Sequence, residues 1–317
     1  MLNLENLSKS FRGGSFGSGA VPAVRQVSFS IAPGEVTSLI GESGSGKSTI
    51  GKMILRLLPV SSGRITFDGV DVASLEGSAL KVYYRKVQGV FQDPFSSFNP
   101  VFRADRIFTM LEREYFGDLG AREWSAKLHT SLEAVGLNPA DVLGKFAHEL
   151  SGGQLQRLLV ARALLLDIEI LVADEVISML DASTRVDVLN LLAGLKERGL
   201  GVLFITHDLS LGHYISEHTV ILRRGVVLEM GETAKVFGNP QHSYTKMLLA
   251  SVPRLHSHWE PLEPGEPART GPRDAPRGRG RRARGQPLEP VPLLVEVEPG
   301  HLVAFEDGGT ATAGVER

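Results

Sequence analysis

The chain has 317 residues, a formal net charge of −2 and no cysteine. This length can hold one large domain or two modest ones, and the nearly neutral charge argues against a protein that mainly coats nucleic acid. The lack of cysteine excludes disulfides, thiolate zinc sites and cysteine-ligated clusters. The first residues lack the apolar core of a secretory signal, and no apolar stretch approaches about 18 residues, so we expect neither export by that route nor a membrane span.

Short apolar runs in the first hundred residues predict a region rich in strands. These runs predict strands at 27–31, 36–40, 64–67 and 87–91. The second strand leads directly into GESGSGKST at 41–49. Apolar residues then recur at helical spacing, at Ile50, Met53, Ile54, Leu57 and Leu58. The sequence therefore predicts a strand, a glycine-rich loop and a helix in succession.

The loop fits the phosphate-binding pattern G-x-x-x-x-G-K-[ST]. Glycines let backbone N–H groups come close to phosphate oxygens, and the start of a helix favours an anion. Lys47 adds a positive charge at the β- and γ-phosphates, and the Ser48 hydroxyl is suited to Mg²⁺. The candidate nucleotide-binding residues of this loop are Gly41, Ser43, Gly44, Ser45, Gly46, Lys47, Ser48 and Thr49. Because a glycine-rich turn can match by chance, a second independent motif is needed.

The next part of the chain changes character. From about 104 to 160, apolar residues follow helical spacing, and glycines at 117, 120 and 136 separate the segments. This pattern predicts a small helical subdomain. Within it, LSGGQLQR at 150–157 places Ser151, Gly152 and Gly153 just before a helix that begins near Gln154. These residues form either a plain helix cap or a second anion site.

The sequence ILVADE at 170–175 is an apolar strand that ends in two carboxylates. Asp174 is well placed to hold Mg²⁺ through its waters, and Glu175 to orient or deprotonate an attacking water. A solvated acidic pair is the alternative, and it is less favoured beside the glycine-rich loop. A helix at 183–198 and a strand at 202–206 follow, so we expect parallel strands with crossover helices. Two runs at 220–222 and 226–228 predict a hairpin.

The pattern of regular elements ends after Pro253. Residues 254–290 are rich in proline, glycine and arginine, including RGRGRRAR at 277–284, and this composition predicts a flexible linker. A contact with anionic lipid or RNA is a weaker alternative. Alternation returns in 291–305, which predicts a short hairpin docked on the main domain, within an extension that covers 291–317.

Taken together, these motifs resemble those of ATP-binding cassette (ABC) ATPases over about residues 2–253. LSGGQ is the signature sequence of that superfamily, ILVADE is similar to its Walker B strand, and the motif order agrees. The resemblance implies an α/β fold, a P-loop NTPase with a RecA-like core, an antiparallel β subdomain and a helical subdomain, here with a partly disordered C-terminal extension. It also implies ATP and Mg²⁺ as cofactors. In this family two domains form a head-to-tail dimer, in which the signature of one faces the P-loop of the other.

The resemblance assigns roles to further residues. Gln92 matches the Q-loop glutamine that reaches metal and water, and Asp181 matches the D-loop at the dimer interface. His207 matches the switch histidine at the γ-phosphate, although a lone histidine is more often structural. Phe11 lies where the family stacks an aromatic ring on adenine, with a core phenylalanine as the alternative. The expected catalytic residues are Glu175, His207 and Gln92, the metal ligands are Ser48, Gln92 and Asp174, and the signature contacts to nucleotide are Ser151, Gly152, Gly153 and Gln154.

Two positions depart from the family pattern. Val176 follows Glu175 where the family usually has proline, and Ile168 stands in the middle of D-I-E where D-P-E is ordinary. Neither change removes a reacting group. The first affects the backbone beside Glu175 and leaves open a regulatory subunit that binds ATP with little turnover.

VFQDPFSSFNP at 90–100 and NPQHSYTKMLLASVP at 239–253 are similar to the dipeptide, oligopeptide and nickel importer ATPases of bacteria. That resemblance implies an ATP-hydrolysing subunit at the cytoplasmic face of the cell membrane that powers uptake of peptides or a related solute. The implied partners are a second ABC ATPase, two membrane permease subunits and an extracytoplasmic substrate-binding protein. Phe95, Phe98 and Pro100 would supply the apolar surface for the permeases.

A soluble ABC protein that acts on ribosomes or DNA is the alternative function. Such proteins usually have two cassettes, long coiled-coil insertions or zinc insertions. This chain has one cassette, no cysteine and no heptad run, so we expect no nucleic-acid partner.

Overall fold

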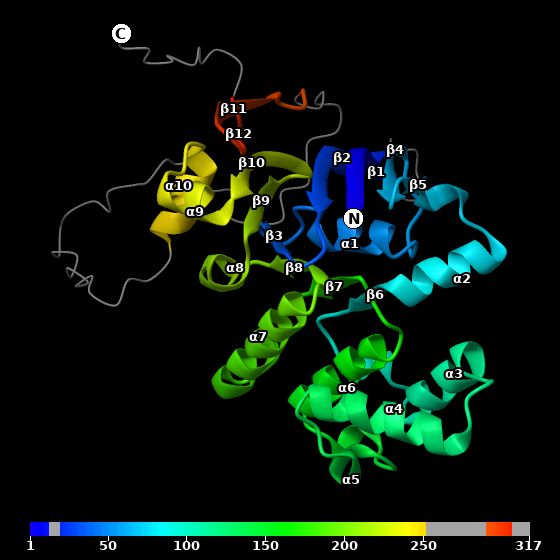
Figure 1. Cartoon of the computed structure of the whole chain (residues 1–317). Helices are drawn as coiled ribbons and strands as arrows, with labels where there is room; N and C mark the ends of the chain where they lie inside the picture. Colours follow the sequence, from blue (N-terminus) through cyan, green and yellow to red (C-terminus); the bar gives the residue numbers. More distant parts are fainter. Residues whose placement is uncertain (13–19, 252–289, 306–317) are drawn as a thin grey trace, which may run out of the picture.

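A computed structural model of the chain describes residues 1–12, 20–251 and 290–305. The described residues form two β-sheets and a group of helices (Figure 1). The larger sheet has eight strands in the order β11-β12-β10-β9-β3-β8-β7-β6. Its strands are β3 (Val36–Ile40), β6 (Val87–Val90), β7 (Ile170–Asp174), β8 (Gly201–Thr206), β9 (His218–Arg223), β10 (Val226–Glu232), β11 (Leu294–Glu298) and β12 (His301–Ala304).

The centre of this sheet is parallel and buried on both faces. Strand β3 pairs in parallel with β8 and β9, and β7 pairs in parallel with β6 and β8. Every residue of β3, β7 and β8 is buried, which explains their continuous apolar sequences. The helices α1 (Lys47–Ile54), α7 (Ala182–Glu197) and α8 (Leu209–Ile215) follow three of these strands. This arrangement confirms the expected α/β P-loop core.

The smaller sheet is antiparallel, with the order β2-β1-β4-β5. Its strands are β1 (Leu2–Phe11), β2 (Val21–Ile31), β4 (Ser62–Phe67) and β5 (Val70–Asp71). The sequence patterns gave no strand for β1, and they started the next strand at residue 27 instead of Val21. They also missed α2 (Gly77–Lys86), which lies in the chain between β5 of the smaller sheet and β6 of the larger one.

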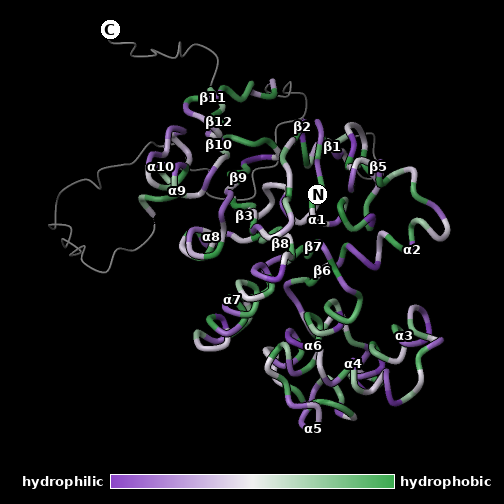
Figure 2. The backbone as a smooth tube through the Cα atoms, in the orientation of Figure 1, coloured by the Kyte–Doolittle hydropathy of each residue, from purple (hydrophilic) through white to green (hydrophobic). Residues whose placement is uncertain are grey.

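A helical subdomain projects from the core at the lower right of Figure 1. It contains α3 (Arg106–Tyr115), α4 (Ala121–Ala134), α5 (Pro139–Val142) and α6 (Gly152–Leu164). Its helices alternate hydrophobic and hydrophilic residues along their length (Figure 2). Buried side chains such as Phe108, Leu132 and Leu155 join it to the same apolar cluster as Leu171 of β7. Short 3₁₀ turns lie at Val72–Ser74, Phe95–Ser97 and Ala147–Glu149.

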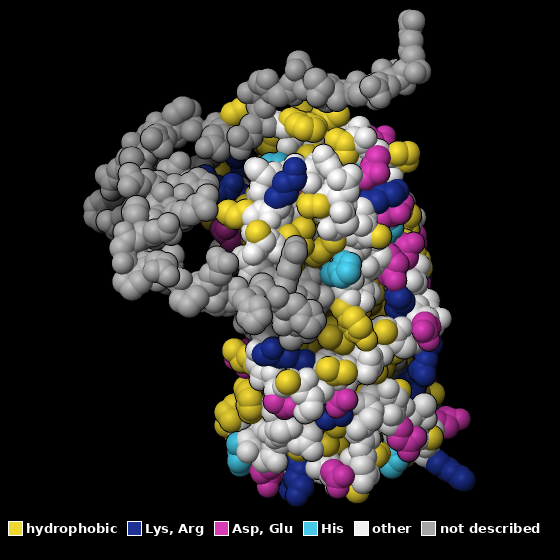
Figure 3. Space-filling view, turned by 90° about the vertical axis from the view of Figure 1, so that its left-hand side faces the viewer, with side chains coloured by type: hydrophobic (Ala, Val, Ile, Leu, Met, Phe, Trp, Pro, Cys, Tyr) yellow, Lys and Arg dark blue, Asp and Glu magenta, His cyan; other side chains and the backbone are white. Residues whose placement is uncertain are grey.

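The last described elements extend the large sheet on its β9 side. The strands β9 and β10 form a hairpin whose turn residues Arg224 and Gly225 both have positive φ, 48° and 82°. After α9 (Thr233–Gly238) and α10 (Ser243–Ala250), the β11–β12 hairpin adds to the edge of β10 through β12. Apolar side chains are visible at the top of Figure 3. In and beside β11, Leu293, Val295 and Val297 are exposed.

Some sequence-based expectations fall on residues that the structure does not describe. The predicted linker at 254–290, apart from its last residue, lies outside the described residues, and so do RGRGRRAR and residues 306–317. Within the described ranges, no helix combines the length and apolar character needed to cross a membrane.

Candidate functional site

Four loops meet at the carboxyl edge of the parallel strands. The glycine-rich loop follows β3, Gln92 follows β6, Glu175 follows β7 and His207 follows β8. Since parallel strands end at one edge of a sheet, these loops are neighbours in space. They enclose a cavity of about 480 Å³ lined by Ala23, Ser43, Gly44, Gly46, Lys47, Ser48, Thr49, Gln92, Glu175 and His207. The structure therefore brings most of the predicted P-loop residues together with all three predicted catalytic residues, Glu175, His207 and Gln92.

Two glycines of the loop are required by close approach of other backbone segments. A Cβ at Gly41 would lie 2.0 Å from the carbonyl oxygen of Leu222 in β9. A Cβ at Gly46 would lie 2.5 Å from the carbonyl oxygen of Ala23 in β2, and Gly46 has a φ of 108°. The loop is thus fixed from both sides while its inner face stays open to the cavity.

Lys47 begins α1 and is held inside the loop. Its Nζ donates hydrogen bonds to the carbonyl oxygens of Gly41 at 2.7 Å and Glu42 at 2.9 Å. Burial lowers the pKa of Lys47, and the carboxylates of Glu175 and Asp174 act against that shift. The ammonium group therefore lies near the start of α1, where the unpaired backbone N–H groups also favour an anion.

The second group of polar atoms suits a magnesium ion. Ser48 Oγ donates to Asp174 Oδ1 at 3.1 Å, so the hydroxyl and the carboxylate already lie side by side. Burial raises the pKa of Asp174, while the hydrogen bond from Ser48 acts to lower it. No cluster of three or more histidine or acidic side chains that could hold a metal occurs in the described ranges. One carboxylate and one hydroxyl match the way Mg²⁺ binds beside nucleotide phosphates, with water and phosphate oxygens completing its shell.

Glu175 and His207 form a pair on the wall of the cavity. Glu175 has a φ of 50°, and its N–H donates to the carbonyl oxygen of Ile205 at 2.9 Å. Its Oε1 lies 3.2 Å from Nδ1 of His207, whose side chain is 60% exposed. Val176, the departure from the usual proline, is buried with 3% exposure. The pair can thus face solvent in the cavity while its backbone remains anchored in the sheet.

The signature residues and Asp181 lie outside this cavity wall and form a second surface. Ser151 caps α6, with Ser151 Oγ accepting from Gln154 N and Gln154 Oε1 accepting from Ser151 N. Asp181 caps α7 through Ser183 and Thr184, and these donors hold its pKa well below its usual range. A Cβ at Gly153 would lie 2.6 Å from Thr184 Cγ2, so the two helix starts are packed together.

Two residues differ from the sequence-based expectation for the cavity: Phe11, which was predicted to contact adenine, and Ala23, which was not predicted. Phe11 does not line the cavity; its ring is 41% exposed and lies 5.4 Å from Lys9 Nζ. Its role against adenine therefore stays a prediction. Ala23 lines the wall although no pattern in VPAVRQ marks it. Its place depends on the approach of β2 to Gly46, which only the fold reveals.

The P-loop, the paired carboxylates and the capped signature helix on a helical subdomain define an ABC nucleotide-binding cassette. Residues 24–178 match the family described as ABC transporter, and residues 228–281 match the family described as oligopeptide/dipeptide transporter, C-terminal region. The chain is 38% identical to a putative peptide import ATP-binding protein of Brucella ovis, over 96% of both chains. It is 39% identical to the glutathione import ATP-binding protein GsiA of Salmonella paratyphi A, over 90% of this chain and 44% of that protein.

Solved structures agree with these sequence relatives. The dimeric ATP-binding cassette MJ0796, in a post-hydrolysis state bound to ADP and Pi, superposes with a TM-score of 0.65 and 29% identity, covering 74% of this chain and 99% of that one. The fold also matches cbiO1 of Clostridium perfringens, with a TM-score of 0.64 and 24% identity over 75% of this chain and 90% of that one. This chain belongs to the ABC transporter family of ATP-binding proteins, and it is an ATPase of that family.

Proposed function

We propose that this chain is the ATP-hydrolysing subunit of a bacterial ABC importer that powers uptake of peptides or a related small solute through separate membrane subunits. One observation carries the proposal. The cavity that joins Lys47, Glu175 and His207 occurs in a chain that matches a putative peptide import ATP-binding protein over 96% of both chains. The peptide class rests on the names of such relatives and on the match of residues 228–281 to the oligopeptide/dipeptide transporter C-terminal region.

Each residue in or beside the cavity has its own role in the proposed reaction. Lys47 and the loop amides would bind the β- and γ-phosphates, and Ser48, Asp174 and Gln92 would hold Mg²⁺. Neutralisation of charge on the phosphate oxygens is the chemistry that bound Mg²⁺ supplies. Glu175 orients a water molecule and takes its proton at a carboxylate oxygen as the water oxygen bonds to the γ-phosphorus. The bond between that phosphorus and the β,γ-bridging oxygen breaks, and ADP is the leaving group. His207, whose Nδ1 lies 3.2 Å from Oε1 of Glu175, would donate to the γ-phosphate in this proposal.

A second copy or a similar ATPase completes the site. Ser151, Gly152, Gly153 and Gln154 do not line the cavity of their own chain, so they are free to meet nucleotide bound elsewhere. A head-to-tail dimer places this signature surface on the P-loop of the other subunit. The dimeric cassette of similar fold supports this arrangement.

The surface after Gln92 is suited to the permease subunits. A hollow of about 260 Å³ lies between this segment and α3, and its lining includes Phe98, Phe102 and Met110. Phe95 is 48% exposed, whereas Phe98 is buried with 7% exposure, so Phe98 forms the floor of the hollow and not its rim. A Cβ at Gly152 would lie 3.9 Å from the ring of Phe95. A permease subunit that docks here, at the cytoplasmic face of the membrane, and displaces Phe95 would therefore also displace the start of the signature helix.

The test is to purify the tagged full chain from mildly solubilised native membranes and identify its partners by mass spectrometry. We expect two multi-spanning proteins, an extracytoplasmic binding protein and a second ABC ATPase or a second copy of this chain. Recovery of ribosomal or DNA-associated proteins without any membrane protein would refute the importer and favour a soluble ABC ATPase. The binding protein recovered would then identify the transported solute.

A further inference from the structure

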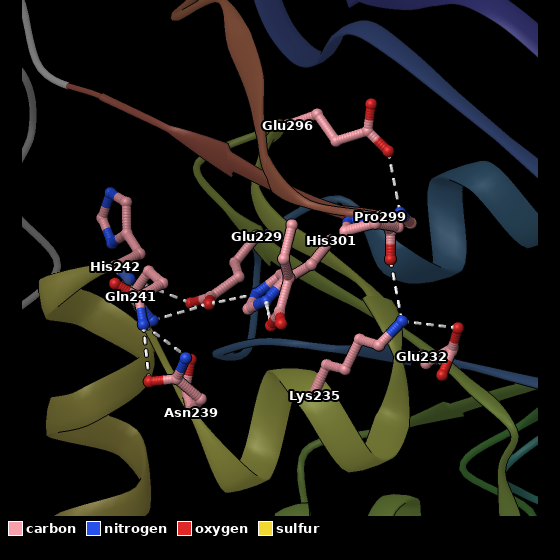
Figure 4. Close-up of polar contacts among 11 residues, drawn as sticks. Glu229, Glu232, Lys235, Asn239, Gln241, His242, Glu296, Pro299 and His301 are labelled. Atoms are coloured by element: carbon pink, nitrogen blue, oxygen red, sulfur yellow. Dashed lines mark hydrogen bonds and ion pairs between the residues drawn. The ribbon is translucent and has the colours of Figure 1, made fainter. Parts of the chain in front are cut away.

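A buried charged cluster joins the C-terminal hairpin to the core. Glu229 in β10 and His301 in β12 are both completely buried, and Nε2 of His301 lies 2.8 Å from Oε1 of Glu229 (Figure 4). Nδ1 of His301 lies 2.8 Å from Oε1 of Glu298. Each ring nitrogen of His301 thus lies within hydrogen-bond distance of a carboxylate. Loss of one partner would leave a buried polar group without its hydrogen bond, so this pairing fixes the hairpin against β10.

The same carboxylate also fixes the start of α10. Glu229 accepts hydrogen bonds from the backbone N–H of Gln241 at 2.8 Å and of His242 at 3.1 Å (Figure 4). His242 in turn caps α10, since its Nδ1 accepts from the N–H of Tyr244 at 3.0 Å. The docked hairpin and the position of Tyr244 therefore depend on one buried group.

Tyr244 connects the hairpin to the residues at the start of the P-loop. Its side chain is 2% exposed and shares an apolar cluster with Ile40, the residue just before the loop, and with Ala304 of β12. The guanidinium carbon of Arg223 lies 4.7 Å from the centre of its ring. Burial and the nearby charge of Glu42 raise the pKa of the Tyr244 hydroxyl to about 12.

The two loop residues that directly follow Ile40 are the ones that hold Lys47. The carbonyl oxygens of Gly41 and Glu42 accept its two hydrogen bonds, and Gly41 packs against the carbonyl of Leu222, next to Arg223. A shift of Tyr244 would therefore move the ammonium group away from the position that phosphates require. Glu175 and His207 follow β7 and β8, and the buried apolar residues of those two strands belong to the other two apolar clusters.

We propose that Tyr244 is a positioning residue of the nucleotide site, through which the docked C-terminal hairpin sets the affinity for ATP. The proposal rests on the proposed role of the P-loop in binding phosphate. It assigns the hairpin a task in nucleotide binding and leaves the chemical step to the cavity residues. The required readout is a change in binding and KM without a matching change in kcat.

The first experiment compares Tyr244→Leu and Tyr244→Phe in the full chain. We expect Tyr244→Leu to raise both the Kd for Mg·ATP and KM by about tenfold, with kcat changed by less than about twofold, because the ring that supports the loop is lost. Tyr244→Phe keeps the ring and should remain within about twofold of the wild type. Phe108→Leu is the matched control, since Phe108 is also a buried aromatic residue but lies in α3. Its Kd should be unchanged.

The second experiment tests the path from the hairpin. His301→Gln should raise the Kd for Mg·ATP about threefold or more alone, but by less than about twofold in the Tyr244→Leu background, because coupled residues are not additive. If Tyr244→Leu does not fold, Arg223→Met, which removes the cation above the same ring, should raise Kd in its place.

Three results would overturn the proposal: wild-type affinity in Tyr244→Leu or its substitute, an equal loss of affinity in Phe108→Leu, or fully additive effects of Tyr244 and His301. A wild-type chain that does not bind Mg·ATP would instead refute the P-loop assignment itself.

Discussion

The glycines of the P-loop offer a direct test of how the loop is constrained. Gly44 and Gly46 both have positive φ, 81° and 108°, but their surroundings differ. A Cβ at Gly44 would have no heavy atom within 4 Å, whereas a Cβ at Gly46 would overlap the carbonyl of Ala23 at 2.5 Å. Alanine at each position therefore separates the cost of conformation from the cost of steric overlap.

The expected magnitudes follow from these two terms. Gly44→Ala has only the left-handed conformation to accommodate, at about 1–2 kcal/mol. Gly46→Ala has a similar conformational cost, and relief of the overlap must also move β2, where Val24 and Val27 are buried. Overpacking of this kind costs about 1–3 kcal/mol. We expect Gly46→Ala to be less stable than Gly44→Ala by roughly that second amount.

The assay is urea unfolding of the nucleotide-free chain, followed by circular dichroism and tryptophan fluorescence. The two variants should have similar m-values and different midpoints, since the difference lies in the folded state. Equal midpoints for Gly44→Ala and Gly46→Ala would refute the argument. That result would mean that the approach of Ala23 does not restrict position 46.

Three further outcomes are expected. Glu175→Gln should keep ATP affinity but lower turnover by roughly 10²- to 10⁴-fold, the usual contribution of a general base, and unchanged phosphate release would remove Glu175 from that role. Lys47→Ala should raise the Kd for Mg·ATP by roughly 10- to 100-fold, because hydrogen bonds to charged groups contribute about 1.5–3 kcal/mol, and normal affinity in a binding titration would contradict the P-loop assignment. Burial raises the pKa of Tyr83 above its ordinary value of 10.0, so the unfolded chain loses this proton first as pH rises. The contribution of Tyr83 to the free energy of unfolding should be complete below about pH 10 and should fall above it by up to about 1.4 kcal/mol per pH unit. Tyr83→Phe should remove this contribution to the pH dependence of the unfolding free energy, as measured by urea melts. An unchanged pH dependence would contradict the argument.

The parts of the fold that could be predicted are those with a continuous local pattern. Strands β3, β7 and β8 are buried on both faces and are therefore apolar throughout. Strand β1 has no such pattern, because Asn6 has a φ of 48° and the pairing shifts register between Leu4 and Leu7. That irregularity breaks the alternation on which a strand prediction depends.

The same distinction holds for the candidate site. The P-loop, Asp174 and Glu175 lie in short contiguous motifs whose chemistry can be read directly. Ala23 and the pair of Glu229 with His301 depend on contacts between distant segments; the two members of that pair are 72 positions apart. A buried histidine and a glutamate in separate strands have no shared pattern in the sequence, so only the folded chain reveals that they meet.

The local chemistry of the signature surface also bears on the proposed head-to-tail dimer. The start of α6 offers backbone N–H groups to an anion, and the capping box uses those of Ser151 and Gln154 but not those of Gly152 and Gly153. Asp181, however, caps the helix packed against Gly153, and its low pKa keeps a negative charge nearby. A free phosphate would meet this charge without a lysine to offset it. We infer that the surface binds nucleotide strongly only when Lys47 of another subunit brings the phosphates to it, so ATP itself becomes the link between the two chains.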